Sequence, residues 1–354
     1  MSEGNYSYKF CPKCGARANS DSAFCVKCGA PLRPSNTETK TSAQGSGQAA
    51  ASQSAAKPQQ KKGSAKGAIV MIALAALVVW ALFSGSTQHY KDYPSAGAHV
   101  LPQMLKHDET LYVSMSTADY NPFLGGQSLA DKILTEAERY SGKAAEGERL
   151  GLLCWPTQVE TYQTGKKGDV YDLNLKIHMQ YFLTEAQDKE LAASVQSILS
   201  GLRLDGLSDY EKVRAIYNYI CAHVTYDYDR LEDDSDVLKY TAYAAVKRGT
   251  AVCSGVADLF YYLANSAGVE THIKTNTIHA WNFVKLGGKY YYLDATWDLG
   301  KNEANYDYFL KGSVDFQHYG GILIGLHGAG NLLTNTDKGY DFSHYEYGSP
   351  LNDR

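Results

Sequence analysis

Cys253 lies at a position in the sequence where the local structure could make its thiol reactive. It lies in GTAVCSGVADLF (249–260), between a turn of small residues and an apolar run. Val256, Leu259 and Leu263 recur at helical spacing, so Cys253 is predicted in the first turn of a buried helix. The unpaired N–H groups and the dipole of such a turn favour a thiolate and can stabilise an oxyanion. The alternative is a cysteine that packs as a small apolar residue.

His279 and Asp294 lie at the two ends of a predicted hairpin. The glycines 287–288 suit a two-residue turn, and a register with Leu286 opposite Lys289 makes His279 and Asp294 diagonal neighbours on one face. A carboxylate that fixes the tautomer of an imidazole and supports its charge is the orienting half of a Cys-His-Asp triad. The alternatives are a core histidine and a turn-capping aspartate.

The surrounding elements predict an α+β order with antiparallel strands. Alternating apolar residues in VYDLNLKIHMQYF (170–182) indicate a half-buried strand, and 127–141 and 185–200 are predicted helices. Ser208 and Glu211 form a predicted capping box at the start of the next helix. The acidic stretch LEDDSD (231–236) is expected to be a solvated loop.

Four stretches resemble the transglutaminase-like superfamily, which has a papain-like scaffold. They are HVTYDYD (223–229), TAYAAVKRGTAVCSGVADLFYYLANSAGV (241–269), HAWNFVKLGGKYYYLDATWD (279–298) and YFLKG (308–312). The resemblance implies a core of helices packed on an antiparallel sheet. It also implies that Cys253 is the nucleophile, His279 the general base and Asp294 the orienting acid. An aromatic donor to the oxyanion would be Tyr226 or Tyr228.

The implied chemistry is thiol acyl transfer on protein or peptide amides. Cys253 would attack a carboxamide or peptide carbonyl, and the acyl group would pass to an amine or to water. No cofactor is expected for catalysis. A cysteine peptidase or deamidase is one alternative, and a non-catalytic extracellular module that binds peptide or cell-wall material is another.

A second cysteine pattern lies near the N-terminus. The stretch FCPKCGARANSDSAFCVKCGA (10–30) contains two C-x-x-C-G knuckles, whose thiols are Cys11, Cys14, Cys25 and Cys28. Four thiolates suit a tetrahedral structural zinc ion, whereas an iron centre and a redox-active pair are the alternatives. Residues 9–32 resemble the short zinc ribbons at the N-termini of many bacterial membrane proteins.

An apolar run follows a polar linker, which covers residues 33–66 and is too poor in large apolar residues to form a core. GAIVMIALAALVVWALF (67–83) has no charged residue and would span roughly 26 Å as a helix. Residues 67–86 are therefore predicted to be an uncleaved transmembrane anchor in the lipid bilayer. A buried core helix and a cleaved signal peptide fit less well, because no polar stripe exists and the run starts far from Met1.

The distribution of charge predicts the orientation of this anchor. Residues 1–66 contain ten basic and three acidic residues, whereas the rest contains 24 basic and 35 acidic residues. Lysines cluster before the apolar run, so the N-terminus is expected in the cytoplasm and residues 87–354 outside the cell membrane. The ribbon would then be available to a cytoplasmic partner, which the sequence does not name. Because the outer part is acidic, no nucleic-acid partner is expected for it.

The outer part is expected to have three regions: a membrane-proximal region over 87–200, the catalytic core over 201–320 and a C-terminal segment over 321–354. Three cysteines, Cys154, Cys221 and Cys253, occur in it without paired spacing. A disulfide framework is therefore not expected.

Overall fold

The computed structural model describes residues 8–10, 17–19, 89–231, 233, 235–275, 279–312 and 340. The predicted zinc ligands Cys11, Cys14, Cys25 and Cys28 lie outside these residues, as do the linker, the apolar segment 67–86 and nearly all of 321–354. Two short strands near the N-terminus, β1 (Tyr8–Phe10) and β2 (Arg17–Asn19), form an antiparallel pair. No helix in the described part of the chain is long and apolar enough to cross a membrane.

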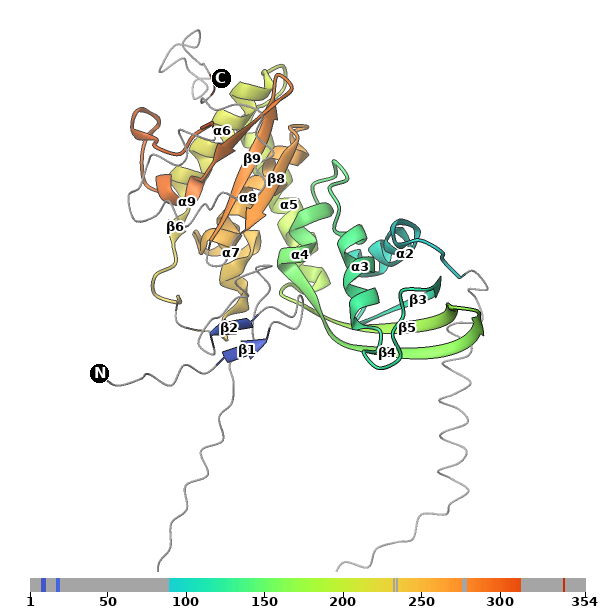
Figure 1. Ribbon diagram of the computed structural model, residues 1–354. Coiled ribbons are helices and arrows are strands. Elements are labelled where there is room, and N and C mark those ends of the chain that lie inside the picture. The colour runs from blue at the N-terminus through green and yellow to red at the C-terminus, as the bar shows by residue number, and fades with distance from the viewer. Residues whose placement is uncertain are drawn as a thin grey trace, which may run out of the picture.

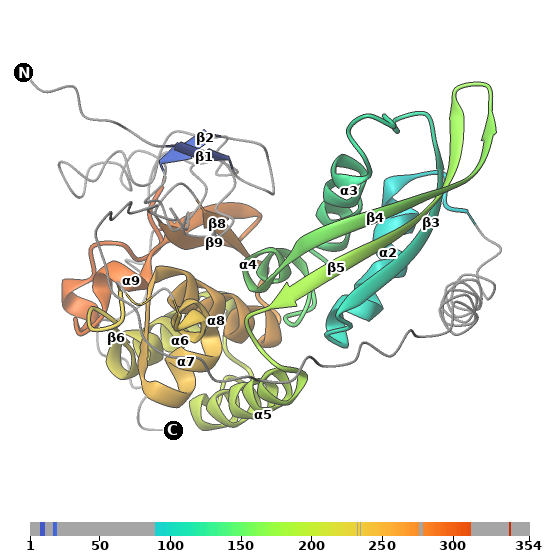
Figure 2. The same ribbon diagram turned by 90° about the horizontal axis from the view of Figure 1, so that it is seen from below.

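The first unit is a three-stranded antiparallel sheet in the order β3-β5-β4, with α2 and α3 packed beside it (Figure 2). Its elements are, in chain order, α2 (Tyr93–Leu105), β3 (Thr110–Thr117), α3 (Gln127–Ala137), η1 (Gly147–Arg149), α4 (Leu150–Leu153), β4 (Cys154–Lys167) and β5 (Val170–Tyr181). Leu173, Leu175 and Ile177 alternate along β5 and are fully buried. The predicted helix at 127–141 and the strand at 170–182 are both present.

The second unit is built around a buried helix, α8. Its elements are α5 (Glu185–Leu202), α6 (Asp209–His223), β6 (Thr225–Tyr226), η2 (Val237–Tyr240), α7 (Ala242–Arg248), β7 (Thr250–Ala251), α8 (Cys253–Ser266), β8 (Thr271–Thr275), β9 (Ala280–Leu286), β10 (Lys289–Leu293), α9 (Ala295–Asp298) and η3 (Glu303–Asn305). The antiparallel sheet β8-β9-β10 packs on α8, and α5, α6 and α7 contact α8 as well (Figure 1). Every residue of 255–265 is buried, as an apolar face on a central helix requires.

Two local signals of the sequence reappear in this unit. Ser208 accepts a hydrogen bond from the Glu211 N–H, while the Glu211 carboxylate accepts one from the Ser208 N–H, so the predicted capping box forms. Gly287 and Gly288 both have positive φ, as the two-residue turn of a hairpin demands. Lys289 pairs with Leu286, which is the register that this turn predicts.

Two expectations about the fold need correction or refinement. The two three-stranded sheets are antiparallel, as predicted, whereas the two-residue strands β6 and β7 form a parallel pair. The pair forms because the chain leaves α6 and enters α8 side by side, a proximity that no local pattern encodes. The boundary expected between residues 200 and 201 falls inside α5, whose Leu191 and Val195 belong to the hydrophobic core of the second unit.

Residues 146–149, a short segment of the first unit, pack against α8 and β8 of the second unit. The Arg149 side chain is 1% exposed, and its Nε donates to Asp258 Oδ1 on α8 at 2.9 Å. Glu148 accepts from the Ile273 N–H at 2.8 Å and contacts the His272 ring. The Tyr261 hydroxyl donates to the backbone oxygen of Glu146. The segment 146–149 therefore completes the core that holds α8 and β8.

Candidate functional site

Cys253 is the first residue of α8, as the apolar spacing after it predicts. Val252 precedes the helix with an extended backbone, and its side chain accepts no hydrogen bond from the N–H groups of the first turn. The thiol is partly buried. Gly255 allows this turn to approach its neighbours, since a Cβ there would lie 2.8 Å from the Thr241 backbone oxygen and 3.0 Å from that of Lys239.

The His279 imidazole and the Asp294 carboxylate are in direct contact. Nε2 of His279 lies 2.6 Å from Asp294 Oδ2, and the two side chains are 7% and 1% exposed. The other carboxylate oxygen, Oδ1, accepts from the Thr296 N–H at 3.0 Å and caps α9. Asp294 is therefore also a helix cap, as the alternative interpretation predicted, because one oxygen of its carboxylate contacts His279 and the other caps α9. Capping fixes the carboxylate that orients the imidazole.

The charges around His279 favour its protonated form. Burial alone would lower the pKa of the imidazole, but Asp294 and, to a smaller degree, Cys253 outweigh burial and raise this pKa to about 10. The effect of Cys253 on this pKa places the thiol close to the ring. Since Nε2 faces Asp294, the nitrogen left for the sulfur is Nδ1. Of the sequence-predicted residues, His279 and Asp294 are thus in direct contact, and Cys253 lies close enough to raise the pKa of the imidazole.

Trp297 is a neighbour of the imidazole that the sequence did not identify. Its indole Nε1 lies 2.9 Å from His279 Nε2, the nitrogen that also contacts Asp294. One ring nitrogen cannot donate to a carboxylate and accept from an indole at the same time. The carboxylate is therefore the partner of protonated Nε2, and the indole N–H is the partner of Nε2 without its proton.

Tyr226 supplies a phenol next to the thiol. It lies on β6, and its ring centroid is 4.8 Å from that of Tyr228. Burial raises the pKa of the Tyr226 phenol, and the nearby Cys253 raises it further, so this hydroxyl stays protonated and can donate. Tyr228 is 76% exposed, and no contact between Tyr228 and Cys253 is found among the described residues. Of the two candidate donors, Tyr226 is the one next to the sulfur.

A pocket of about 590 Å³ opens beside His279. Its walls include the aromatic side chains of Tyr226, Tyr228 and Trp297 and the aliphatic side chain of Leu231. Cys253 does not line the pocket, but the sulfur lies close to His279, which does. Among its described lining residues there is no Asp, Glu, Lys or Arg, so the His279 imidazolium is the charged group on a wall that is otherwise uncharged.

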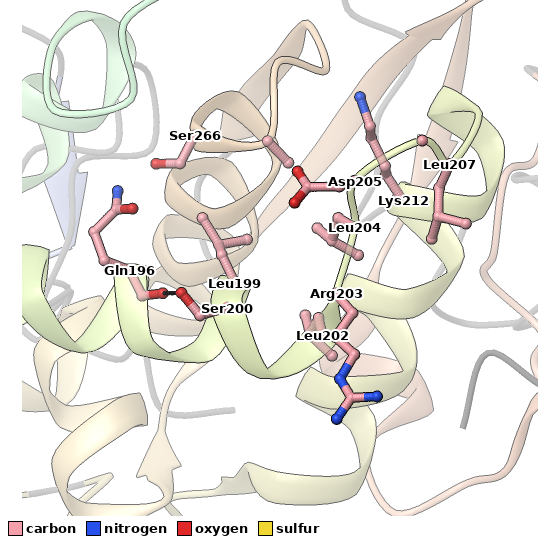
Figure 3. A pocket seen from close by; sticks show the side chains of 12 residues that line it. Gln196, Leu199, Ser200, Leu202, Arg203, Leu204, Asp205, Leu207, Lys212 and Ser266 are labelled. Carbon is pink, nitrogen blue, oxygen red and sulfur yellow. Dashed lines mark hydrogen bonds between the residues drawn. The ribbon is translucent and has the colours of Figure 1, made fainter. Parts of the chain in front are cut away.

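A larger hollow, of about 680 Å³, lies at the opposite end of α8 (Figure 3). It is formed by the end of α5, the 203–207 loop and Ser266, and Figure 3 shows Asp205 and Lys212 on its rim. The rise of α8 separates Ser266 from Cys253 by about 20 Å. This hollow contains none of the three predicted catalytic residues and is therefore separate from the chemistry.

A buried lysine holds the loop that carries the pocket wall. The Lys239 side chain is fully buried, and its Nζ donates to the backbone oxygens of Arg230, Leu231 and Asp233 at 2.6, 3.0 and 2.8 Å. Asp236 of the same loop pairs with Arg248 at 2.5 Å. The expectation that residues 231–236 form a solvated loop holds for Leu231, Asp233 and Ser235, which are exposed, whereas Asp236 is only partly exposed. The backbone oxygens that bind Lys239 are the part of the loop that does not face water. A lone lysine next to an acidic stretch carries no sequence signal for this role.

In the described part of the chain, no group of three or more His, Cys, Asp or Glu side chains could hold a metal ion. The four cysteines predicted to bind zinc lie outside it.

Known families match two parts of the chain. Residues 197–295 match the transglutaminase-like superfamily, and residues 10–32 match a zinc-ribbon domain. A transglutaminase-like domain and a zinc-ribbon domain are therefore found in this chain. The first match contains Cys253, His279 and Asp294, and the second contains all four N-terminal cysteines.

The alignments with individual relatives cover only a small part of each relative. Kyphoscoliosis peptidase of Mus musculus is 28% identical over 132 residues, which is 32% of this chain and 20% of that protein. The Homo sapiens protein of the same name is 28% identical over 125 residues, 30% of this chain and 19% of its own. The chain thus spans about a fifth of the length of these relatives. A solved structure titled "Crystal structure of a TGase" aligns with 40% of this chain and 44% of its own, at 16% identity and a TM-score of 0.27.

Proposed function

We propose that the transglutaminase-like domain is a thiol acyltransferase or hydrolase that acts on protein or peptide amides. Cys253 is the nucleophile, His279 the acid and base, and Asp294 the residue that orients the imidazole. The observation that carries this proposal is the buried imidazole of His279, which contacts Asp294 at 2.6 Å and whose pKa is also raised by the nearby thiol at the start of α8. Such an arrangement suits nucleophilic catalysis by a base-activated thiol.

The reaction has two balanced steps. The Cys253 thiolate attacks the amide carbonyl, the C–N bond breaks, and the leaving nitrogen takes a proton from the His279 imidazolium. An amine or water then attacks the thioester and gives a proton to His279, and the thiolate leaves. Because the pKa of His279 is about 10, the imidazole carries the needed proton at neutral pH. The N–H groups of the first turn of α8 and the Tyr226 hydroxyl stabilise the oxyanion.

The acceptor decides between cross-linking and hydrolysis. The relatives named peptidase support a peptide bond as acyl donor and water as acceptor. The uncharged aromatic wall formed by Tyr226, Tyr228 and Trp297 also suits a carboxamide, which is the donor in transfer to an amine. Both outcomes pass through the same thioester on Cys253. A non-catalytic module that binds peptide remains the alternative from another class.

We propose further that residues 67–86 anchor the chain in the cell membrane, with the N-terminus in the cytoplasm and the transglutaminase-like domain outside. The uncharged run at 67–83 and the lysines before it support this arrangement. The zinc-ribbon match over 10–32 supports one structural zinc ion held by Cys11, Cys14, Cys25 and Cys28. Four thiolates complete a tetrahedral shell, so this zinc would stabilise the ribbon and leave catalysis to the other domain.

Trapping the thioester tests the catalytic proposal. The full chain is mixed with a peptide library, quenched in acid and digested, and acyl adducts are located by mass spectrometry. We expect an adduct on Cys253 and none on the buried Cys154 or Cys221. Cys253→Ala should abolish the adduct, and His279→Ala should reduce its formation by about 10²- to 10⁴-fold. Peptide binding by both variants, with no adduct from the unmodified chain, would favour the binding module.

A further inference from the structure

An adjacent pair of large apolar side chains is exposed on the loop between β3 and α3. Phe123 is 97% exposed and Leu124 is 74% exposed. Single apolar side chains on a surface are ordinary, but two neighbours at one tip form a patch that water solvates poorly. Figure 1 shows this loop passing over the edge strand β4, and Gly126 at its end lies against Thr161 and Val159 of that strand.

The backbone of this tip is held in a defined turn. The Leu124 N–H donates to the backbone oxygen of Asn121 at 3.0 Å, and the Phe123 N–H donates to Asn121 Oδ1 at 2.9 Å. Pro122 fixes one φ of the turn, and Gly125 closes it with a φ of 69°. Because the backbone is fixed, the two apolar side chains remain displayed and do not fold back onto the sheet.

The point where the described chain enters this unit lies at the same end of the sheet. The Tyr90 N–H donates to the Ser114 oxygen at 2.9 Å, and the Ser116 N–H donates to the Tyr90 oxygen at 2.8 Å, next to the last residues of β3. The apolar turn leaves β3 from that end, where Tyr120 packs edge-on against Tyr171 with centroids 5.3 Å apart. Figure 2 shows the loop leaving this end of β3.

The length of chain before Tyr90 ties this end of the sheet to the bilayer. The proposed anchor ends at residue 86, and four residues reach at most roughly 14 Å when fully extended. The headgroup layer of a bilayer is itself about 5 to 8 Å thick on each side. Wherever the anchor crosses the membrane, this end of the sheet must therefore lie at its surface.

We infer that Phe123 and Leu124 insert into the interfacial layer of the bilayer that holds the proposed anchor. The pair forms a second contact, and two contacts fix the orientation of the first unit on the membrane, which a single tether cannot do. Lys166 and Lys167, both exposed and paired with the start of β5 at this end, would meet anionic headgroups. The inference rests on the proposed anchor and is independent of the catalytic proposal.

Photo-crosslinking of the full chain tests this contact. Benzoylphenylalanine replaces Phe123 in one preparation and Tyr228 in another, since Tyr228 is an aromatic side chain that is 76% exposed at the pocket of the second unit. Both chains are inserted into vesicles of phosphatidylcholine and phosphatidylglycerol and irradiated. We expect lipid adducts at position 123 and none at 228. Adducts at 123 with a second copy or another protein, or equal lipid adducts at both positions, would overturn the inference.

An alkaline carbonate wash separates this inference from the anchor. A chain that resists extraction but forms no lipid adduct at 123 keeps its anchor and loses the proposed contact. A chain that the wash extracts from the vesicles contradicts the anchor, and the contact inference is lost with it. In the variant Leu124→Ser, which leaves Gly125 and its positive φ unchanged, we expect lipid adducts from benzoylphenylalanine at position 123 to decrease. Unchanged thioester formation on Cys253 verifies that this variant is folded.

Discussion

At the scale of single residues, Asp294 controls the proton on which the proposed reaction depends. The pKa of His279 is raised to about 10 by Asp294 and Cys253 against the opposing effect of burial. The acyl-transfer activity, measured as kcat/KM, should therefore fall as the pH rises through about 10. In Asp294→Asn the carboxylate charge is lost, so we expect this alkaline limb at a lower pH and a turnover about 10²- to 10⁴-fold lower.

A matched control is Asp307→Asn, which changes a half-exposed carboxylate that pairs with Lys301. Its pH profile should equal that of the unmodified chain. An unchanged alkaline limb in Asp294→Asn would mean that another group titrates there. The same pKa shift predicts that the charged imidazole stabilises the fold fully below its ordinary pKa of 6.5 and that this contribution is lost as the pH rises towards 10.

At the scale of elements, Lys239 connects η2 to the loop that forms one wall of the pocket. In Lys239→Met the three backbone oxygens of residues 230, 231 and 233 lose their buried donor. We expect stability to fall by about 1–3 kcal/mol, because a buried acceptor without a partner carries its full desolvation cost. Tyr228 and Leu231 would lose their fixed position, so KM should rise more than kcat falls.

Steady-state kinetics and chemical denaturation together check this expectation. Lys247→Met is the matched control, because Lys247 is partly exposed on α7 and pairs only at the surface with Glu190. Its stability should change by less than about 0.5 kcal/mol, and KM should stay the same. Equal losses in the two variants would contradict a positioning role for Lys239.

At the scale of the whole molecule, the two units should unfold together. Arg149, from the first unit, is buried against Asp258 of α8, and Glu148 is bonded to β8. Arg149→Met leaves the Asp258 charge buried without its ionic partner, so we expect a loss of about 3–5 kcal/mol. Calorimetry should show residues 89–312 melting in one transition that moves to lower temperature.

Arg139→Met is the control for this prediction. Its side chain is 70% exposed and pairs with Glu136 on the same segment, so the transition should hardly move. A fragment that begins at residue 201 lacks Arg149 and Glu148 and should not fold. Two separate melting transitions in the full chain would show that the clamp does not couple the units.

Features that depend on neighbouring residues could be predicted from the sequence. The start of α8 at Cys253, the capping box at Ser208, the alternation along β5 and the turn at 287–288 all follow from spacing and from local backbone preferences. Because that turn has two residues, it also set the register that brings His279 next to Asp294. The zinc-ribbon domain was likewise visible as a short, self-contained pattern, and the membrane anchor at 67–86 stays a prediction.

Contacts between residues that are distant in the chain could not be predicted, because they depend on how the whole chain packs. The bond between Arg149 and Asp258 joins positions 109 residues apart, and the parallel pair β6-β7 joins segments separated by a loop and two helices. No local sequence pattern marks Lys239 or Trp297, and both find their hydrogen-bond partners only when the folded chain buries them. A buried charge or N–H must find a partner wherever the packed chain offers one, and this requirement has no fixed spacing in the sequence.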